Sequence, residues 1–198
     1  MAHVPLLDHP KGLVPRLAQR VGRRRFGRPV EPIQAASHHT GVLETMGRLE
    51  WSVQRRWKKL DPTLRWLALQ GAASRIGCPW CVDYGTSEAV RQGMDEAKLA
   101  AVAMWRSSDL FDAREQAVLA YTEAATDTPA VVSDELAARV RAYLSDAEFV
   151  ELAAWVALEN YRSRFNAGLG LQSQGFAAAC GVPPPAGPDQ PRAANARG

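Results

Sequence analysis

Apolar residues recur along this chain at the three- and four-residue spacing of a helix face, and the alternating pattern of a half-buried strand is nearly absent. Proline, glycine and capping residues divide the pattern into separate segments. The sequence therefore predicts an all-α protein, a multi-helix bundle. We expect helices at residues 11–26, 41–60, 63–76, 79–92, 94–105, 113–126, 133–144 and 145–171.

Polar residues mark where some of these helices begin. Ser145 and Glu148 have the spacing of a capping box, in which each side chain bonds to the other residue's backbone N–H. For the second helix, either Ser37 or Thr40 supplies the capping hydroxyl, and the sequence leaves that choice open. The segment at 29–37 is assigned no helix.

The chain of 198 residues is long enough for one domain with a sizeable core. We divide it into an N-terminal extension at 1–9, a single helical domain at 10–181 and a tail at 182–198. The tail is rich in proline, glycine and alanine and has no core-forming stripe, so it is predicted to be disordered.

The formal net charge of +3 comes largely from two basic segments, at residues 20–29 and 53–59. No nucleic-acid-binding motif accompanies them, so we interpret them as solvated helix ends or subunit contacts and expect no nucleic-acid partner. No apolar run reaches the roughly 18 to 20 residues that a membrane helix needs. The first residues also lack the apolar core of a secretory signal peptide. A soluble cytoplasmic protein without a membrane partner is therefore expected.

Two of the three cysteines, Cys78 and Cys81, form a C-x-x-C motif directly after Gly77. Gly77 is suited to end one helix and Pro79 to begin the next, which makes Cys78 the expected N-cap. Cys81 then lies about one turn further on the same side, and the two sulfurs come within bonding reach. Because a helix N-terminus favours the thiolate, the reactive form of cysteine, the motif predicts a redox-active dithiol.

Three other interpretations of the cysteine pair stay open. A zinc site needs three or four ligands, and neither Cys180 nor the histidines form a second C-x-x-C or H-x-x-x-H pattern. A purely structural disulfide would close too small a loop to gain much stability. Two buried, inert cysteines are the remaining alternative. We predict neither a metal ion nor an organic cofactor.

The segment LRWLALQGAASRIGCPWCVDYGTSEAVRQGM resembles the core of the carboxymuconolactone decarboxylase-like proteins, which include the alkyl hydroperoxidase D group. The segment ALENYRSRFNAGLGLQSQGF is similar to the end of one subgroup. The resemblance implies an all-helical fold that assembles as a trimer or hexamer. It also implies that Cys78 and Cys81 reduce a hydroperoxide, form a disulfide and are reduced again by a dithiol. In that group the second cysteine usually attacks the peroxide.

Two positions depart from the peroxidase pattern of this family. Gly85 stands where the pattern has a histidine, and Trp66 stands where it has a glutamate. Those two groups form the proton relay of the peroxidases, so acid–base help worth about a hundred- to ten-thousand-fold is missing from its usual place. The candidates for a substitute relay are Tyr84, Glu88, Glu123 and Glu159. For Glu159, a structural ion pair with Arg162 or Arg164 is the alternative.

The combined prediction is a thiol-dependent oxidoreductase with a peroxidase-like or disulfide-reductase-like dithiol cycle. Its expected partners are a hydroperoxide or disulfide substrate, a dithiol protein or small thiol as reductant, and further copies of the chain. One alternative is a lactone decarboxylase-like enzyme acting on a small carboxylated substrate. Another is a non-catalytic helical oligomer or redox sensor.

Overall fold

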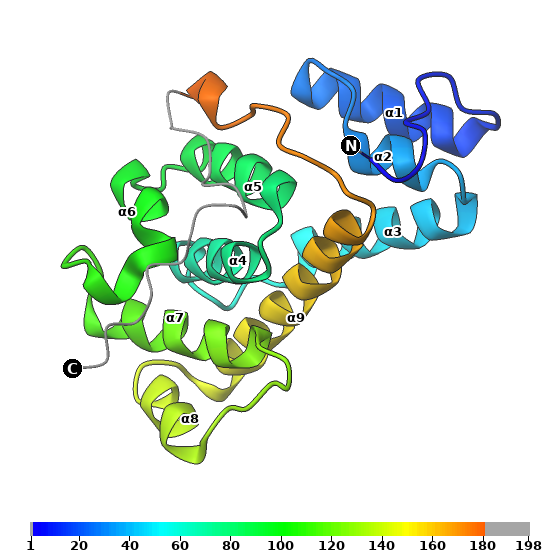
Figure 1. Cartoon of the computed structure of the whole chain (residues 1–198). Coiled ribbons are helices and arrows are strands. Elements are labelled where there is room, and N and C mark those ends of the chain that lie inside the picture. Colours follow the sequence, from blue (N-terminus) through cyan, green and yellow to red (C-terminus); the bar gives the residue numbers. More distant parts are fainter. Residues whose placement is uncertain (1, 181–198) are drawn as a thin grey trace.

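The computed structural model describes residues 2–180, and this part of the chain consists of helices and connecting segments without a strand (Figure 1). The predicted all-α fold is confirmed, while the prediction for the tail at 182–198 lies outside the described residues. No helix of the described part is long and apolar enough to cross a membrane. The elements are α1 (Leu13–Phe26), α2 (Glu31–Ala36), α3 (Thr40–Arg56), α4 (Pro62–Ile76), α5 (Pro79–Arg91), α6 (Glu96–Ala101), the 3-10 helix η1 (Val102–Ser107), α7 (Ala113–Thr126), α8 (Asp134–Arg141), α9 (Asp146–Gly168) and the 3-10 helix η2 (Ala178–Cys180).

Helix α4 is the centre of the fold, and α5, α7 and α9 pack around it (Figure 1). Most of α4 is apolar or small, so Leu64, Leu67 and Ala72 are all buried. A helix that is apolar on every side needs neighbours on every side. Trp155 of α9 is the largest of the fully buried side chains in this core. Helix α4 therefore fixes the positions of α5 and α9, which carry the site described below.

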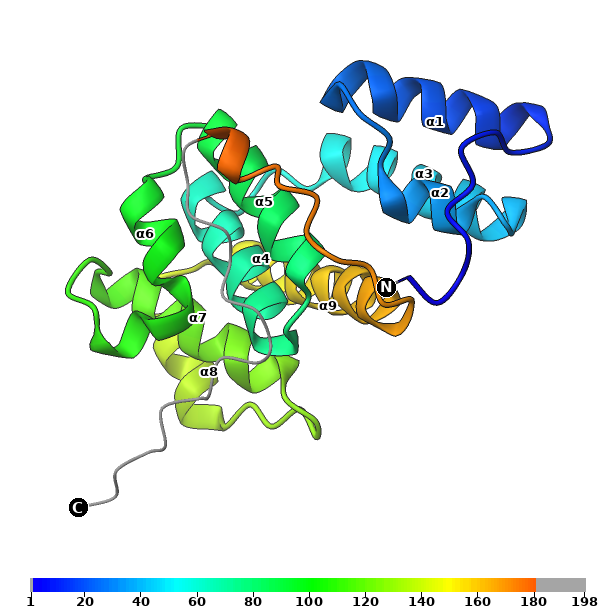
Figure 2. The ribbon, with the colours of Figure 1, turned by 45° about the horizontal axis from the view of Figure 1, so that its top comes forward.

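Helices α1, α2 and α3 pack on one another as a second layer at one end of the molecule, near α5 and α9 (Figure 2). Arg25 of α1 forms an ion pair with Glu88 of α5 at 2.8 Å. Arg162 of α9 forms one with Glu50 of α3 at 2.6 Å. These ion pairs join the second layer to the helices that carry the site.

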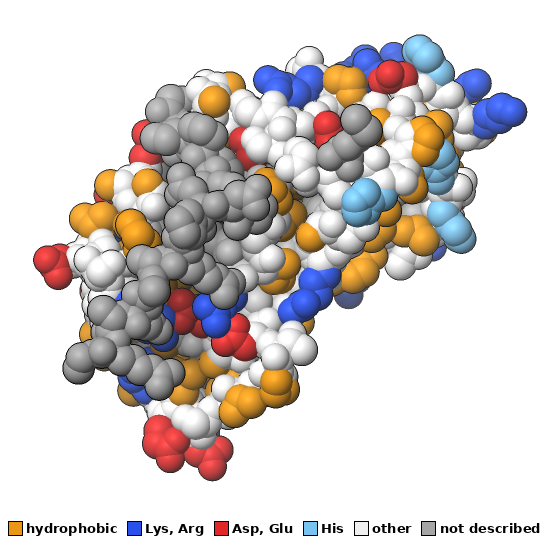
Figure 3. Space-filling model, viewed as in Figure 1, with side chains coloured by type: hydrophobic (Ala, Val, Ile, Leu, Met, Phe, Trp, Pro, Cys, Tyr) orange, Lys and Arg blue, Asp and Glu red, His pale blue; other side chains and the backbone are white. Residues whose placement is uncertain are grey.

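Basic side chains gather over α1 on the surface of this second layer (Figure 3). Arg23, Arg24 and Arg25 lie in the last turn of α1, where the negative end of the helix dipole favours cations. Arg23 also pairs with Asp8 of the N-terminal extension at 3.4 Å. The basic segment at 20–29 thus includes the C-terminal end of a helix.

The predicted helix starts are partly confirmed. Ser145 and Glu148 make both bonds of the capping box at the start of α9. Helix α3 begins at Thr40, but its N-cap is His39, whose Nδ1 accepts a hydrogen bond from the backbone N–H of Val42 at 3.3 Å. Ser37 instead closes α2, since its hydroxyl donates to the carbonyl of Ile33 at 2.6 Å.

Two short elements differ from the sequence prediction. The sequence predicts no helix where α2 lies, because six residues are too few to show a helical stripe of apolar positions. The helix expected at 94–105 is divided into α6 and η1, and Met104 has non-helical backbone angles (φ −124°). Both differences arise where local sequence gives a weak signal and packing against neighbours decides the conformation.

Candidate functional site

The cysteine turn joins the end of α4 to the start of α5. Gly77 ends α4 with φ of 77°, in the left-handed region that favours glycine, and Pro79 is the first residue of α5. Cys78 is the N-cap, as predicted from the sequence, and its Sγ accepts a hydrogen bond from the backbone N–H of Cys81 at 3.2 Å. The local sequence thus brings both sulfurs to the positive end of α5.

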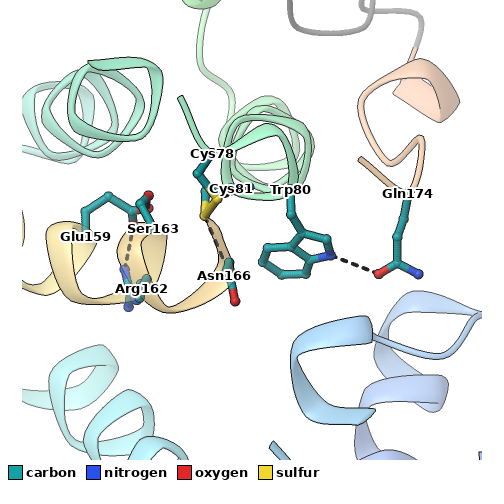
Figure 4. The surroundings of a disulfide bond; sticks show 8 residues. All are labelled: Cys78, Trp80, Cys81, Glu159, Arg162, Ser163, Asn166 and Gln174. Carbon is teal, nitrogen blue, oxygen red and sulfur yellow. Dashed lines mark hydrogen bonds and ion pairs between the residues drawn. A yellow bond between two sulfur atoms is a disulfide. The ribbon is translucent and has the colours of Figure 1, made fainter. Parts of the chain in front are cut away.

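The two cysteines form a disulfide with an S–S distance of 2.15 Å (Figure 4). They are therefore within bonding reach, as the C-x-x-C spacing predicts. Cys78 is 0% exposed and Cys81 is 5% exposed, so the pair lies beneath other residues. Chemistry at these sulfurs requires a route through what covers them.

Residues 169–177, here called the covering segment, run from the end of α9 past α5 (Figure 1), and Leu171 and Phe176 of this segment are buried in one cluster with both cysteines. Asp83 of α5 holds this segment, because its carboxylate accepts the backbone N–H groups of Gln174 at 2.8 Å and Ala177 at 2.7 Å. Trp80 lies between the two cysteines in sequence, and its indole N–H donates to Gln174 Oε1 at 2.9 Å (Figure 4). Hydrogen bonds to Asp83 and Trp80, together with the buried apolar side chains of Leu171 and Phe176, thus hold the covering segment against α5.

Helix α9 presents a polar face to the cysteine turn. Glu159, Ser163 and Asn166 follow one another at four- and three-residue spacing, which places them on one side of the helix (Figure 4). Asn166 Nδ2 donates to Cys81 Sγ at 3.3 Å. The Asn166 side chain is buried, and its Oδ1 has no hydrogen-bond partner among residues 2–180. Asn166 is not among the site residues predicted from the sequence.

Glu159 is a buried carboxyl group on this face. Burial raises the pKa of Glu159, and the charge of Arg162 and the hydroxyl of Ser163 offset this only in part. Ser163 Oγ donates to Glu159 Oε1 at 2.8 Å. A carboxyl group whose pKa is raised is able to hold a proton closer to neutral pH than an exposed one.

Arg162 joins Glu159 to α3, so the ion pair that the sequence allowed as an alternative is present. Its guanidinium binds both oxygens of Glu50, at 2.7 and 2.6 Å, but approaches Glu159 only to 3.3 Å. Burial alone would lower the pKa of Arg162, but the two carboxylates more than offset it and raise the pKa. Glu50 and Glu159 share the charge of Arg162, and the pKa of Glu159 stays raised because burial outweighs the effect of Arg162.

Tyr84 of α5 lies in an aromatic cluster with one side chain of the second layer and one of the covering segment. Its ring stacks on Trp80 with 4.9 Å between centroids and meets Phe26 and Phe176 edge-on. Burial, with a smaller contribution from Glu88, raises the pKa of Tyr84 to about 12. The phenol therefore remains protonated at neutral pH, and it fits packing better than proton abstraction.

The structure brings neither Glu88 nor Glu123 to the sulfurs. Glu88 is held between Arg25 and Arg91, each at 2.8 Å. Glu123 accepts the indole N–H of Trp105 at 2.9 Å and pairs with Arg106. It lines an open groove of about 770 Å³ whose lining residues include neither cysteine.

The two positions of the missing relay are filled by other contacts. Gln70 of α4 lies against Gly85, where a Cβ atom would come within 1.9 Å of Gln70 Nε2. Trp66 is buried and donates its indole N–H to Gln92 at 3.1 Å. Gln70 occupies the space beside Gly85 in which the family's histidine would project, and this close approach requires glycine there.

No group of three or more metal-ligating side chains lies together in the described part of the chain. The amide of Asn166 contacts Cys81, and the hydroxyl of Ser163 and the carboxyl group of Glu159 follow it on the same helix.

Fold and site together define an all-helical protein with a C-x-x-C disulfide at a helix N-terminus. The Carboxymuconolactone decarboxylase family matches residues 40–124. The uncharacterised protein YnjA of Escherichia coli (strain K12) is 30% identical over 183 residues, which cover 92% of this chain and 95% of YnjA. The chain belongs to this family, as its resemblance to the alkyl hydroperoxidase D-like proteins implied.

Solved structures share the fold. The debrominase Bmp8, as a cysteine-to-alanine variant in complex with 2,3,4-tribromopyrrole, superposes with a TM-score of 0.75 at 22% identity, covering 90% of this chain and 97% of Bmp8. A peroxidase-related protein of Ralstonia eutropha JMP134 with an alkylhydroperoxidase AhpD core gives a TM-score of 0.74 at 14% identity, covering 88% and 96%. At these identities the two structures support the fold.

We predict that Gly85→Ala lowers the free energy of unfolding by about 1–3 kcal/mol, because the new methyl group collides with the buried amide of Gln70. Denaturant titration measures this. Gly47→Ala is the matched control: no atom lies within 4 Å of its Cβ position, so it should stabilise α3 by about 0.5–1 kcal/mol. If Gly85→Ala costs the same in a Gln70→Ala background, the two residues are not in conflict and the interpretation fails.

We predict that Gln174→Ala speeds reduction of the Cys78–Cys81 disulfide by dithiothreitol about fivefold or more, because it removes hydrogen bonds worth ~1 kcal/mol each. Thiol release followed with a chromogenic disulfide reagent measures the rate. Gln172→Ala, at an exposed position of the same segment, should leave the rate unchanged. Equal rates for all three proteins would show that the covering segment does not limit access.

Proposed function

We propose that this protein is a thiol-dependent oxidoreductase that cycles Cys78 and Cys81 between dithiol and disulfide, with a hydroperoxide as oxidant. The observation that carries this proposal is the Cys78–Cys81 disulfide at the start of α5, where Cys78 caps the helix. Backbone N–H groups and the helix dipole favour a thiolate at such a position. Membership of a family with peroxidase-related structural neighbours supports it further.

In the first step, the Cys81 thiolate attacks the terminal oxygen of the hydroperoxide. An S–O bond forms and the O–O bond breaks, so that sulfur loses two electrons and becomes a sulfenic acid. The leaving alkoxide takes up one proton and departs as an alcohol. Cys81 is the more exposed of the two cysteines, which favours it as the attacking residue.

In the second step, the Cys78 thiolate attacks the sulfur of the sulfenic acid. The S–S bond forms, the S–O bond breaks, and the hydroxide that leaves takes a proton to become water. The backbone N–H of Cys81 lies 3.2 Å from Cys78 Sγ and stabilises the thiolate that attacks. A dithiol protein or small dithiol then reduces the disulfide by exchange, and the cytoplasm is a compartment that supplies such reductants.

Glu159 is the proposed source of the proton for the leaving alkoxide. Its carboxyl group is buried on the face of α9 that turns toward the cysteines, and burial raises its pKa (Figure 4). Ser163 accompanies it on this face and donates a hydrogen bond to it. Tyr84 packs against the cluster that contains both cysteines, but its phenol, with a pKa raised to about 12, is a weaker acid than a carboxyl group. Glu88 and Glu123 are bound by arginine in other contacts.

The lactone decarboxylase-like and non-catalytic alternatives predict different behaviour of the sulfurs. A decarboxylase of a small carboxylated substrate has no use for a reversible dithiol. A non-catalytic oligomer would leave the cysteines no more reactive than free cysteine. Thiol counting in the presence of a hydroperoxide separates both from the proposed function.

We predict that the reduced protein loses two thiols per chain on adding one equivalent of cumene hydroperoxide. A Cys180→Ser background leaves only the pair at 78 and 81 to be counted with a thiol reagent. Further substitution of Cys78→Ser or Cys81→Ser should abolish the paired loss, because no intramolecular disulfide can form. Loss of thiols only as slowly as from free cysteine would contradict the proposed function.

We predict that Glu159→Gln slows peroxide-dependent thiol loss by about a hundredfold, the lower end of general acid–base help. Because the pKa of Glu159 is raised, the protonated donor persists toward neutral pH, and the wild-type rate should fall as pH rises through that pKa. Stopped-flow measurement as a function of pH should show this alkaline limb in the wild type, and its loss in Glu159→Gln.

Glu88→Gln and Glu123→Gln are matched controls for that substitution. Both remove a carboxylate that is bound by arginine away from the sulfurs, and both should keep the alkaline limb. A Glu159→Gln protein that retains the wild-type pH profile would show that the proton comes from elsewhere.

A further inference from the structure

Asn166 is a buried amide that the oxidised protein uses only in part. Its side chain is 3% exposed, its Nδ2 lies 3.3 Å from Cys81 Sγ, and its Oδ1 has no hydrogen-bond partner within the described residues. A disulfide sulfur is a weak acceptor, so the single bond that the amide makes is a poor one.

Stability of the oxidised fold does not account for this amide. An unsatisfied buried carbonyl costs free energy, and asparagine is a poor residue for a helix interior. Position 166 lies near the end of α9 against the cluster that contains both cysteines, where an apolar side chain would also be buried. A half-used polar group at such a place points to another state of the protein in which the amide has a stronger partner.

Reduction of the disulfide creates such a partner. A Cys81 thiolate is a strong acceptor for the Nδ2–H group, because a hydrogen bond to a charged atom is shorter and stronger than a neutral one. The amide therefore bonds more strongly to ionised, reduced Cys81 than to the disulfide.

We propose that Asn166 is a catalytic residue that holds reduced Cys81 as a thiolate and sets it up to attack. Each cysteine then has its own donor: the backbone N–H of Cys81 for Cys78, and the Asn166 amide for Cys81. The inference rests on the proposed dithiol cycle and adds to it which thiolate is stabilised by a side chain. Because Asn166 stabilises the reduced form, it also makes the disulfide easier to reduce.

The test measures alkylation of Cys81 by iodoacetamide as a function of pH, in the Cys78→Ser, Cys180→Ser background. Serine at 78 still caps α5, so the helix start is kept. Asn166→Ala should raise the pH of half-maximal alkylation by about one unit and lower the rate at pH 7 about tenfold, since the thiolate loses its donor. Asn166→Asp should shift the profile further, because a carboxylate repels the thiolate.

Asn160→Ala is the matched control on the same helix. Asn160 Nδ2 bonds to Thr126 Oγ1 at 3.1 Å and to the carbonyl of Val156 at 3.0 Å, away from the cysteines, and its loss should leave the profile unchanged. Circular dichroism tests whether each variant is folded. If Asn166→Ala does not fold, Asn166→Ser, which keeps a small hydrogen-bond donor, takes its place. Asn166→Ser should shift the alkylation profile less than Asn166→Asp does.

Two results would overturn the assignment. One is an alkylation profile that stays unchanged both in folded Asn166→Asp and in whichever of Asn166→Ala and Asn166→Ser is folded. The other is an equal shift in Asn160→Ala, which would show a general loosening of α9. No hydroperoxide or reductant takes part in the measurement, so failure of the proposed peroxide chemistry and failure of this inference give separate results.

Discussion

The site depends on one local constraint, the way α4 stops and α5 starts. Gly77 adopts the left-handed conformation that ends α4, Pro79 opens α5, and the Cys81 N–H is left to bond to Cys78 Sγ. One helical turn then separates the two cysteines, which is the spacing at which their sulfurs bond. A C-x-x-C sequence without this break between helices would place the same residues in mid-helix, away from free N–H groups.

Burial is the second constraint, and it explains why polar residues gather on α9. Sulfurs that become charged beneath the surface need nearby donors and a nearby proton source, because desolvation otherwise disfavours the thiolate. Asn166 and Glu159 are buried for the same reason that the sulfurs are: α4, α5 and α9 pack tightly on one another. The ion pair between Arg162 and Glu50 joins α9 to α3, so the positive charge of Arg162 near the site is balanced by a carboxylate of a neighbouring helix. The covering segment is held against α5 by hydrogen bonds to Asp83 and by buried apolar side chains.

What the sequence predicts well is local in the chain. The N-cap role of Cys78 follows from three adjacent residues, and the capping box of α9 follows from Ser145 and Glu148. The contact between Asn166 and Cys81 spans 85 positions and exists only because α5 and α9 pack together, so no local pattern reveals it. Glu123 and Glu159 are both flanked by apolar residues in sequence, and only tertiary structure distinguishes the one bound to Trp105 from the one beside Ser163. The family resemblance predicts the class of function but not the proton relay. At position 85 the family's histidine is replaced by glycine, and Gln70 packs against it.

The central claim is that the bond between Cys78 and Cys81 is a working redox couple rather than a structural link. The most direct measurement equilibrates the protein in a series of glutathione or dithiothreitol redox buffers and counts alkylated thiols by mass spectrometry. The account predicts a midpoint potential between about −270 and −120 mV, the range of catalytic dithiols. A midpoint below about −300 mV, typical of structural disulfides, or the failure of these two cysteines to form a bond under any poise, would contradict it.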